Sequence, residues 1–222
     1  MVYLYHKDAG TPQLILSADA HRYIFKVRRH TVGETLYLRN LTDGVLYGYR
    51  ITLLDKRTAS LSLQTHRVLE IKASTSLHIG WCIIDPKSIE KVLPSLNEMG
   101  VEKITFIYCK RSQKSFKPDF KRLEKILLNS SQQSGRSVMM QLETEESLET
   151  FLQRYPHSSM LHFSETHFIS QREIETIVIG CEGGFHAEEV ALFSEERRVG
   201  FATPLVLKSE SAACAVASKL LL

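Results

Sequence analysis

The 222-residue chain lacks any apolar run close to the roughly 18–20 residues that cross a membrane, so we expect no membrane-spanning helix. Its first residues, MVYLYHKDAG, hold no basic region followed by an apolar segment. We therefore expect no secretory signal and a cytoplasmic protein.

Cysteine is scarce, with four in the whole chain and no C-x-x-C pair. The four are Cys82, Cys109, Cys181 and Cys214. Because metal-ligand spacing is absent, we expect no metal site. We expect these cysteines to be reduced, buried thiols, as is typical of cytosolic proteins.

The glycine-rich stretch TIVIGCEGGF (176–185) is not a G-x-G-x-x-G motif, and no Lys-Ser/Thr follows its glycines. An enzyme that binds the phosphates of a nucleotide is therefore the least favoured class of protein. The stretch does predict a buried strand, a tight turn and a helix that begins near His186. Such a turn presents backbone N–H groups to a small ligand, and Gly183 and Gly184 permit close approach. A turn without a ligand is the alternative, and a second stretch, 200–213, favours a shared ligand.

Basic residues are unevenly distributed. Residues 1–72 carry 11 Lys/Arg and 6 Asp/Glu, a net charge of +5, whereas residues 73–222 carry 17 and 19. Within the second part, residues 103–136 hold 9 basic and 2 acidic residues. Two basic zones favour a polyanionic partner, although a solvated helix face is the alternative for 103–136.

The first 70 residues are typical of a small β-barrel. Short strands are expected at 3–5, 34–39, 44–53 and 59–68, with a short helix at 17–25. Thr42-Asp43-Gly44 is a hairpin-turn signal between two of these strands. We expect residues 1–72 to form one domain, with 71–77 at the boundary.

From His78 onwards strands and helices alternate, which predicts an α/β fold with a mainly parallel sheet in residues 73–222. Strands are expected at 78–84, 103–109, 137–143, 158–163, 176–180 and 197–203. Helices are expected at 89–99, 118–127, 147–155, 186–196 and 209–222. Ligands bind at the carboxyl ends of such strands, so the loops 180–185 and 203–209 should meet at one edge.

Several motifs in order resemble the RsmE family of knotted SPOUT methyltransferases. The loop 180–185 resembles that family's G-P-E-G-G-F, with Cys181 in place of proline. Gly200, Leu207, Glu210 and Ala212 match its L-G-x-x-I-L-R-x-E-T-A motif, with Lys208 for the arginine and Ser211 for the threonine. Residues 98–101, 111–112 and 133–136 resemble its E-L-G-V, R-S and Q-S-x-R segments, and 21–34 resembles its H…V-L-R…G-D.

This resemblance implies a C-terminal SPOUT trefoil-knot domain at 73–222, preceded by a PUA-like, RNA-binding β-barrel at 1–72. It further implies a homodimer that uses S-adenosyl-L-methionine to methylate N3 of a uridine in 16S rRNA of the small ribosomal subunit. The implied cofactor-binding residues are Leu161, His162, Phe163, Gly180, Cys181, Glu182, Gly183, Gly184, Gly200, Pro204, Leu205, Val206 and Leu207.

Methyl transfer to uridine N3 requires alignment of the reacting atoms and stabilisation of a uridine anion by cationic donors. The candidate donors are Arg111, Arg136 and Lys208. A base is supplied by Glu182, by Glu210 or by solvent, and the alternative role of both carboxylates is helix capping. The candidate RNA-binding residues are Arg28, Arg29, Lys110, Arg111 and Lys114.

Two other functions fit the sequence less well. One is a SPOUT methyltransferase that acts on another RNA position, such as a ribose 2′-OH. The other is a non-catalytic RNA-binding protein, which would have no need of the glycine-rich loop.

Overall fold

In the computed structural model, which describes residues 1–163 and 174–222, the backbone divides into two units. The first comprises Met1–Lys72 and Ser131–Met139, and the second Ala73–Ser130 and Met140–Leu222. The sequence does not indicate that 131–139 groups with the first unit. Hydrogen bonds from Ser137 hold this segment to the first unit, because the Ser137 N–H and hydroxyl both donate to the Ile71 carbonyl, at 2.9 and 3.1 Å.

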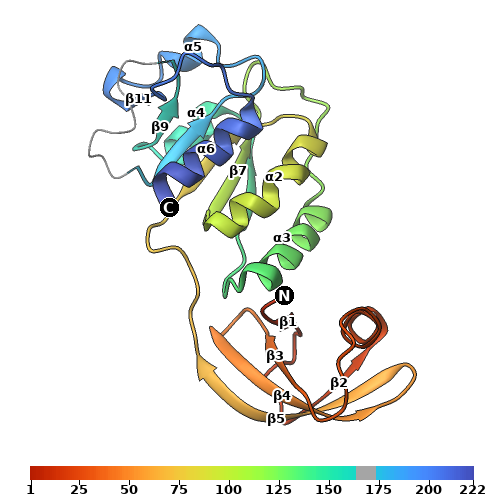
Figure 1. Cartoon of the computed structure of the whole chain (residues 1–222). Coiled ribbons are helices and arrows are strands. Elements are labelled where there is room, and N and C mark those ends of the chain that lie inside the picture. The colour runs from red at the N-terminus through yellow and green to blue at the C-terminus, as the bar shows by residue number, and fades with distance from the viewer. Residues whose placement is uncertain (164–173) are drawn as a thin grey trace. The chain divides into compact units, whose positions relative to one another are not determined.

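The first unit contains a curled sheet of five strands in the order β1-β3-β4-β5-β2 (Figure 1). The strands are β1 (Leu4–Tyr5), β2 (Gln13–Ser17), β3 (Thr35–Arg39), β4 (Val45–Leu54) and β5 (Thr58–Val68). All neighbouring pairs are antiparallel except β1 and β3. A short helix, α1 (Ala18–His21), continues into a π-helical turn at Arg22–Val27. The sequence patterns predict this sheet except for β2.

Alternation along these strands directs one set of side chains into the core of the first unit. That core includes Leu16, Ile24, Leu38, Tyr49, Ile51 and Leu61, all fully buried. The predicted hairpin turn is confirmed between β3 and β4, where Gly44 has φ 69° and the Asp43 carboxylate accepts from the Val45 N–H at 2.9 Å. Glycine suits this position because it adopts positive φ without strain.

The second unit is built on a six-stranded sheet in the order β11-β9-β10-β6-β7-β8, and every neighbouring pair is parallel. The strands are β6 (His78–Cys82), β7 (Lys103–Ile107), β8 (Gln141–Glu145), β9 (Ser159–Leu161), β10 (Thr176–Ile179) and β11 (Arg198–Val199). The helices are α2 (Pro86–Met99), α3 (Phe120–Ser134), α4 (Leu148–Arg154), α5 (Ala187–Val190) and α6 (Ser209–Leu221). The mainly parallel α/β sheet predicted from the sequence is thus confirmed.

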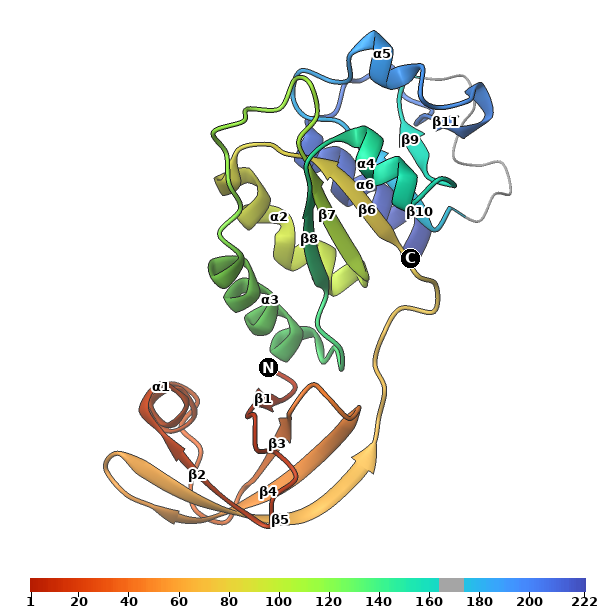
Figure 2. The same cartoon turned by 180° about the vertical axis from the view of Figure 1, so that it is seen from behind.

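Helices cover both faces of this sheet. Figure 1 shows α2 and α6 in front of it, and Figure 2, seen from behind, shows α4 in front. The helix α2 begins where the Asp85 carboxylate accepts from the Ser88 N–H at 3.2 Å, and it ends at Gly100 with φ 103°. Pro94 lies within α2 and does not end it.

Several predicted elements are placed differently. The strand expected at 197–203 is only Arg198–Val199 (β11). The strand expected at 137–143 runs from Gln141 to Glu145, because the preceding residues group with the first unit. The helix expected at 186–196 is only the single turn α5, followed by a 3-10 turn at Glu195–Arg197. Within the described residues, no helix combines the length and apolar character needed to cross a bilayer.

His78, at the start of β6, is buried, with 7% of its surface exposed. Its Nε2 lies 2.8 Å from the Thr105 hydroxyl, and its ring meets the Tyr155 ring edge-on. Burial, and secondarily the Lys103 ammonium, lower the pKa of His78 to about 4. Between that pH and the ordinary value near 6.5, the unfolded chain binds a proton that the folded chain excludes.

Stability supplied by His78 is therefore complete above pH 6.5 and is lost as the pH falls toward 4. Replacing it with glutamine, which keeps a hydrogen-bonding group but does not titrate, is expected to remove about 2 kcal/mol of the stability change between pH 7 and pH 5. Urea unfolding at both pH values measures this change. An unchanged slope in His78→Gln would contradict the prediction.

Candidate functional site

A cavity of about 660 Å³ lies in the second unit, where the strands β9, β10 and β11 end. Leu161 and Ile179, the last residues of β9 and β10, form part of its wall. The segments 180–185 and 205–210, together with Thr203, line it as well. The two loops that the sequence places at one edge of the sheet therefore face the same space, whose volume is that of a typical small-molecule site.

Most of the predicted cofactor-binding residues lie around this cavity. Those that line it are Leu161, His162, Phe163, Gly180, Cys181, Glu182, Gly183, Gly184, Leu205, Val206 and Leu207. Gly200 and Pro204 are not among its lining residues. Three of the candidate catalytic residues, Arg111, Lys208 and Glu182, line the cavity, and the alternative base Glu210 does so too.

The cavity also has lining residues that were not named among the predicted cofactor-binding residues. They are Ser88, Ile179, Phe185, Phe201, Thr203, Ser209 and Ala212. Phe185, Thr203 and Ser209 lie within the predicted loops 180–185 and 203–209, and Ile179, Phe201 and Ala212 lie close to those loops in the sequence. Ser88 differs, because it belongs to the first turn of α2, about 90 positions upstream of the glycine-rich loop. No local pattern connects the two segments.

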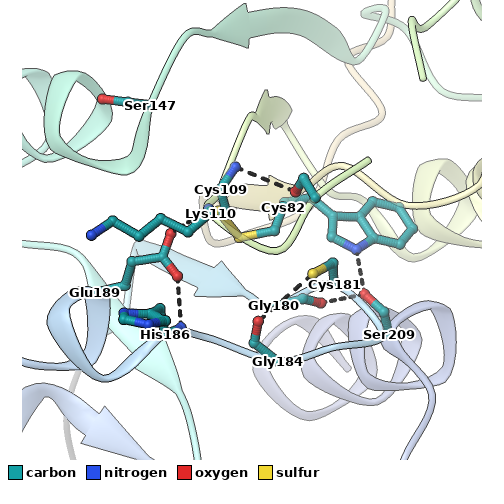
Figure 3. Close-up of a disulfide and its surroundings, with 12 residues drawn as sticks. Cys82, Cys109, Lys110, Ser147, Gly180, Cys181, Gly184, His186, Glu189 and Ser209 are labelled. Atoms are coloured by element: carbon teal, nitrogen blue, oxygen red, sulfur yellow. Dashed lines mark hydrogen bonds between the residues drawn. A yellow bond between two sulfur atoms is a disulfide. The ribbon is translucent and has the colours of Figure 1, made fainter. Parts of the chain in front are cut away.

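The glycine-rich loop is held in a defined turn. The Gly184 N–H donates to the Cys181 carbonyl at 2.9 Å, and Gly184 has φ 67°. The Gly180 carbonyl accepts from the Ser209 hydroxyl at 2.5 Å, and that hydroxyl accepts from the Trp81 indole N–H at 2.8 Å (Figure 3). Ser209 thus joins the first turn of α6 to the end of β10, which fixes both loops relative to each other.

Arg111 crosses from the loop after β7 to the glycine-rich loop. Its guanidinium donates to the Gly183 carbonyl at 2.6 Å, and its side chain is exposed. A guanidinium has five N–H donors, so this contact leaves others for a ligand in the cavity. Lys208 immediately precedes α6 and is also exposed. The site therefore combines apolar walls with two positively charged side chains, Arg111 and Lys208, among its lining residues.

The prediction of four reduced thiols is wrong for Cys82 and Cys109, which form a disulfide (Figure 3). Cys82 ends β6, and Cys109 lies two residues beyond the end of the adjacent strand β7. Their Cα atoms are 5.6 Å apart, within the range that a disulfide spans. The pairing depends on strand order, which the spacing of cysteines in the sequence does not reveal.

The other two cysteines are free thiols, as predicted. Cys181 is buried beside the cavity, and its thiol donates to the Gly184 carbonyl at 3.7 Å. Burial raises the pKa of the Cys181 thiol, with Glu182 adding to the shift. The thiol therefore stays protonated and serves as a small packing group rather than a nucleophile. In the part of the chain that the structure describes, no group of three or more His, Cys, Asp or Glu side chains is placed to hold a metal.

Residues 72–221 match the family described as RNA methyltransferase domain. Two curated relatives, both named ribosomal RNA small subunit methyltransferase E and both from Helicobacter pylori strains, are 38% identical to the chain over 222 residues. Each alignment covers 98% of this chain and 98% of the relative. The chain belongs to the RsmE family.

Solved structures share the fold of this RsmE family member. A protein from Legionella pneumophila, solved with the cofactor SAM bound, has a TM-score of 0.83 at 24% identity, covering 99% of this chain and 96% of its own. Ribosomal RNA small subunit methyltransferase E from Neisseria gonorrhoeae, bound to S-adenosyl methionine, has a TM-score of 0.82 at 17% identity, covering 98% and 95%. At these identities the likeness concerns the fold.

Arg136, the fourth candidate catalytic residue, belongs to the first unit. Its side chain is buried, its Nε donates to the Val138 carbonyl at 2.8 Å, and its own carbonyl accepts from the Tyr3 hydroxyl at 2.7 Å. It is not among the residues that line the cavity. A catalytic role for Arg136 in this RsmE family member stays a prediction.

The predicted RNA-binding residues are divided between the two units. Arg28 and Arg29 follow the π-helical turn of the first unit, and both are exposed. Arg28 donates to the Tyr23 hydroxyl at 3.2 Å, and its guanidinium lies 5.6 Å from the centre of that ring. Lys110 and Lys114 lie in the loop after β7, next to Arg111, and are also exposed.

Proposed function

We propose that this chain transfers the methyl group of S-adenosyl-L-methionine to N3 of a uridine in 16S rRNA of the small ribosomal subunit. One observation carries the proposal: the two motifs that resemble the RsmE family, which follow the different strands β10 and β11, line a single cavity. The chain's 38% identity to two proteins named ribosomal RNA small subunit methyltransferase E, over almost their whole length, supports it.

The cavity suits S-adenosylmethionine chemically. An adenine is recognised by backbone N–H and C=O groups, which the segments 180–184 and 205–208 supply. Apolar side chains from Leu161, Ile179 and Phe201 provide walls for the adenine and ribose. The carboxylates of Glu182 and Glu210 suit a ligand that carries a sulfonium charge. The cofactor contains no phosphate, which agrees with the missing P-loop lysine, and when bound it supplies an electrophilic methyl group.

The protein's own contribution to methyl transfer is alignment and electrostatic stabilisation. Arg111 and Lys208 place positive charge where a uridine carbonyl oxygen becomes anionic as its N3 proton leaves. The proton is accepted by Glu182, by Glu210 or by solvent. Because burial favours the protonated form of the Cys181 thiol, it is not expected to act as a nucleophile.

The first unit is proposed to be a PUA-like RNA-binding domain, residues 1–72. The exposed guanidinium of Arg28 beside Tyr23 supports this, since such a pair offers both a phosphate contact and a stacking surface. Arg29, Lys110 and Lys114 would add phosphate contacts. Affinity for RNA should then fall steeply with salt concentration.

We also propose that residues 73–222 form a SPOUT trefoil knot, that the protein is a homodimer and that it works in the cytoplasm. The exposed apolar side chains of Phe163, Leu205 and Val206 support a second copy covering this region. The alanines of α6 do not support a second copy there. Ala212, Ala213 and Ala217 are already buried within the second unit.

The test is methyl transfer from labelled S-adenosylmethionine to small ribosomal subunits that lack the modification, with free 16S rRNA assayed in parallel. The expected product nucleoside is 3-methyluridine. A different methylated nucleoside would keep the reaction and the cofactor but overturn the proposed target. Absence of both transfer and cofactor binding would favour the non-catalytic RNA-binding alternative.

A further inference from the structure

Glu189, on α5, is a carboxylate with only 2% of its surface exposed, and the chemistry above does not use it. Its two oxygens accept hydrogen bonds from two different segments of the chain. Oε1 accepts from the Lys110 backbone N–H at 2.8 Å, and Oε2 accepts from the His186 backbone N–H at 2.8 Å (Figure 3). A buried charge held in this way is costly unless both bonds form.

The first bond fixes the chain next to Arg111. Cys109, immediately before Lys110, is tied to Cys82 on the neighbouring strand by the disulfide. The Cys109–Lys110 peptide is therefore held from two sides, by the sheet and by Glu189. Arg111 is the next residue, so the direction in which its side chain leaves the backbone depends on this peptide.

The second bond fixes the end of the glycine-rich loop. His186 directly follows that loop and precedes the first turn of α5. The Gly183 carbonyl, three residues earlier, accepts from the Arg111 guanidinium at 2.6 Å. The Arg111 side chain joins the same two segments through its hydrogen bond to Gly183. Glu189 therefore binds the backbone on both sides of that contact, at Lys110 and at His186.

We infer that Glu189 is a positioning residue for methyl transfer, which sets the place of the Arg111 guanidinium against the cavity. The inference rests on the proposed role of Arg111. A carboxylate is needed because two N–H groups converge on one side chain. Glutamine offers a single oxygen, and its NH₂ group would face the other N–H, so one of the two segments would be released.

The neighbouring carboxylate provides a matched control. Glu188 lies on the same turn and pairs with the Lys110 ammonium, but its side chain is 69% exposed and receives no backbone N–H in the described residues. An exposed ion pair contributes little to positioning because water and salt screen it. Glu188→Gln should therefore change kcat by less than about twofold.

The experiment measures kcat and KM for the RNA substrate, together with S-adenosylmethionine affinity, in full-length Glu189→Gln. We expect kcat to fall about 10- to 100-fold, as for a catalytic group misplaced by about 1 Å, with cofactor affinity within about threefold of wild type. Deuterium exchange at the Lys110 amide should rise in the same variant. A kcat within twofold of wild type in a folded Glu189→Gln protein would overturn the inference.

A double-mutant cycle with Arg111→Ala separates positioning from a general structural role. If Glu189 acts through Arg111, then adding Glu189→Gln to Arg111→Ala should lower kcat by less than about twofold. Equal losses in both backgrounds would overturn the inference. An Arg111→Ala variant with wild-type kcat would instead refute the proposed role of Arg111, whatever Glu189→Gln does.

Glu189→Asp covers the case in which the glutamine variant does not fold. Aspartate keeps the charge but is one methylene shorter, so it reaches only one of the two N–H groups. Its kcat should lie between those of wild type and Arg111→Ala, and the loss should disappear in the Arg111→Ala background. A folded Glu189→Asp protein with wild-type kcat would overturn the inference.

Discussion

Arg111→Ala is expected to lower kcat for methyl transfer about 100- to 1,000-fold, the usual cost of removing one donor that stabilises developing negative charge. Arg111 lines the cavity and its side chain is exposed, so its remaining N–H groups are available to a uridine carbonyl oxygen. Cofactor affinity should change far less, because the walls of the cavity remain. Single-turnover transfer to RNA and calorimetric titration with S-adenosylmethionine measure the two quantities.

Two variants control for the loss of charge. Lys125→Ala removes a positive charge from an exposed position on α3 that does not line the cavity, and it should leave kcat unchanged. Arg111→Lys keeps the charge but loses the planar fork of donors, so its kcat should fall between wild type and alanine. Equal activity of Arg111→Ala and Lys125→Ala would exclude Arg111 from the chemistry.

Gly183→Val is expected to weaken S-adenosylmethionine binding by at least about 100-fold, the cost of one well-placed overpacked group. A Cβ at position 183 would lie 3.4 Å from the Cβ and Cδ atoms of Arg111. That distance accepts a methyl group, but the two further methyls of valine must enter either the Arg111 side chain or the cavity. Calorimetric titration with the cofactor measures the loss.

Gly183→Ala separates this crowding from simple loss of glycine. Its single methyl group fits at ordinary contact distance, and Gly183 does not have a positive φ, so alanine should bind the cofactor within a few fold of wild type. Normal cofactor binding by Gly183→Val would show that the ligand does not lie against this loop.

Local signals in the sequence were sufficient for most elements of the second unit. The end of α2 at Gly100 and the apolar runs of β6, β7 and β10 are properties of a few consecutive residues. Such properties are visible in sequence because capping and side-chain period act over one or two turns. The short strand β2 was not predicted, because Gln13–Ser17 has only two buried positions.

The cavity was predicted in part for a similar reason. Parallel strands place their carboxyl ends at one edge, so the loops after β10 and β11 were expected at the same edge of the sheet. Ser88 could not be foreseen, since it reaches the cavity from α2 only through the packing of that helix. The burial of Arg136 could not be predicted from the sequence either, because the segment 131–139 groups with residues 1–72, which are far away in the sequence.

By itself the sequence determined the α/β class of the second unit, the place of the glycine-rich loop after a buried strand and membership of a methyltransferase family. These follow from the periodicity of apolar side chains, from the residues at turns and from the order of the motifs, all of which are local properties of the sequence. Only the tertiary structure decided that Cys82 bonds Cys109, that Arg111 contacts Gly183 and that Glu189 joins Lys110 to His186. The contacts Cys82–Cys109, Arg111–Gly183 and Lys110–Glu189 join residues that are 27, 72 and 79 positions apart in the sequence. Only the contact between Glu189 and His186 is local. The distant contacts exist because strand order and register bring these residues together.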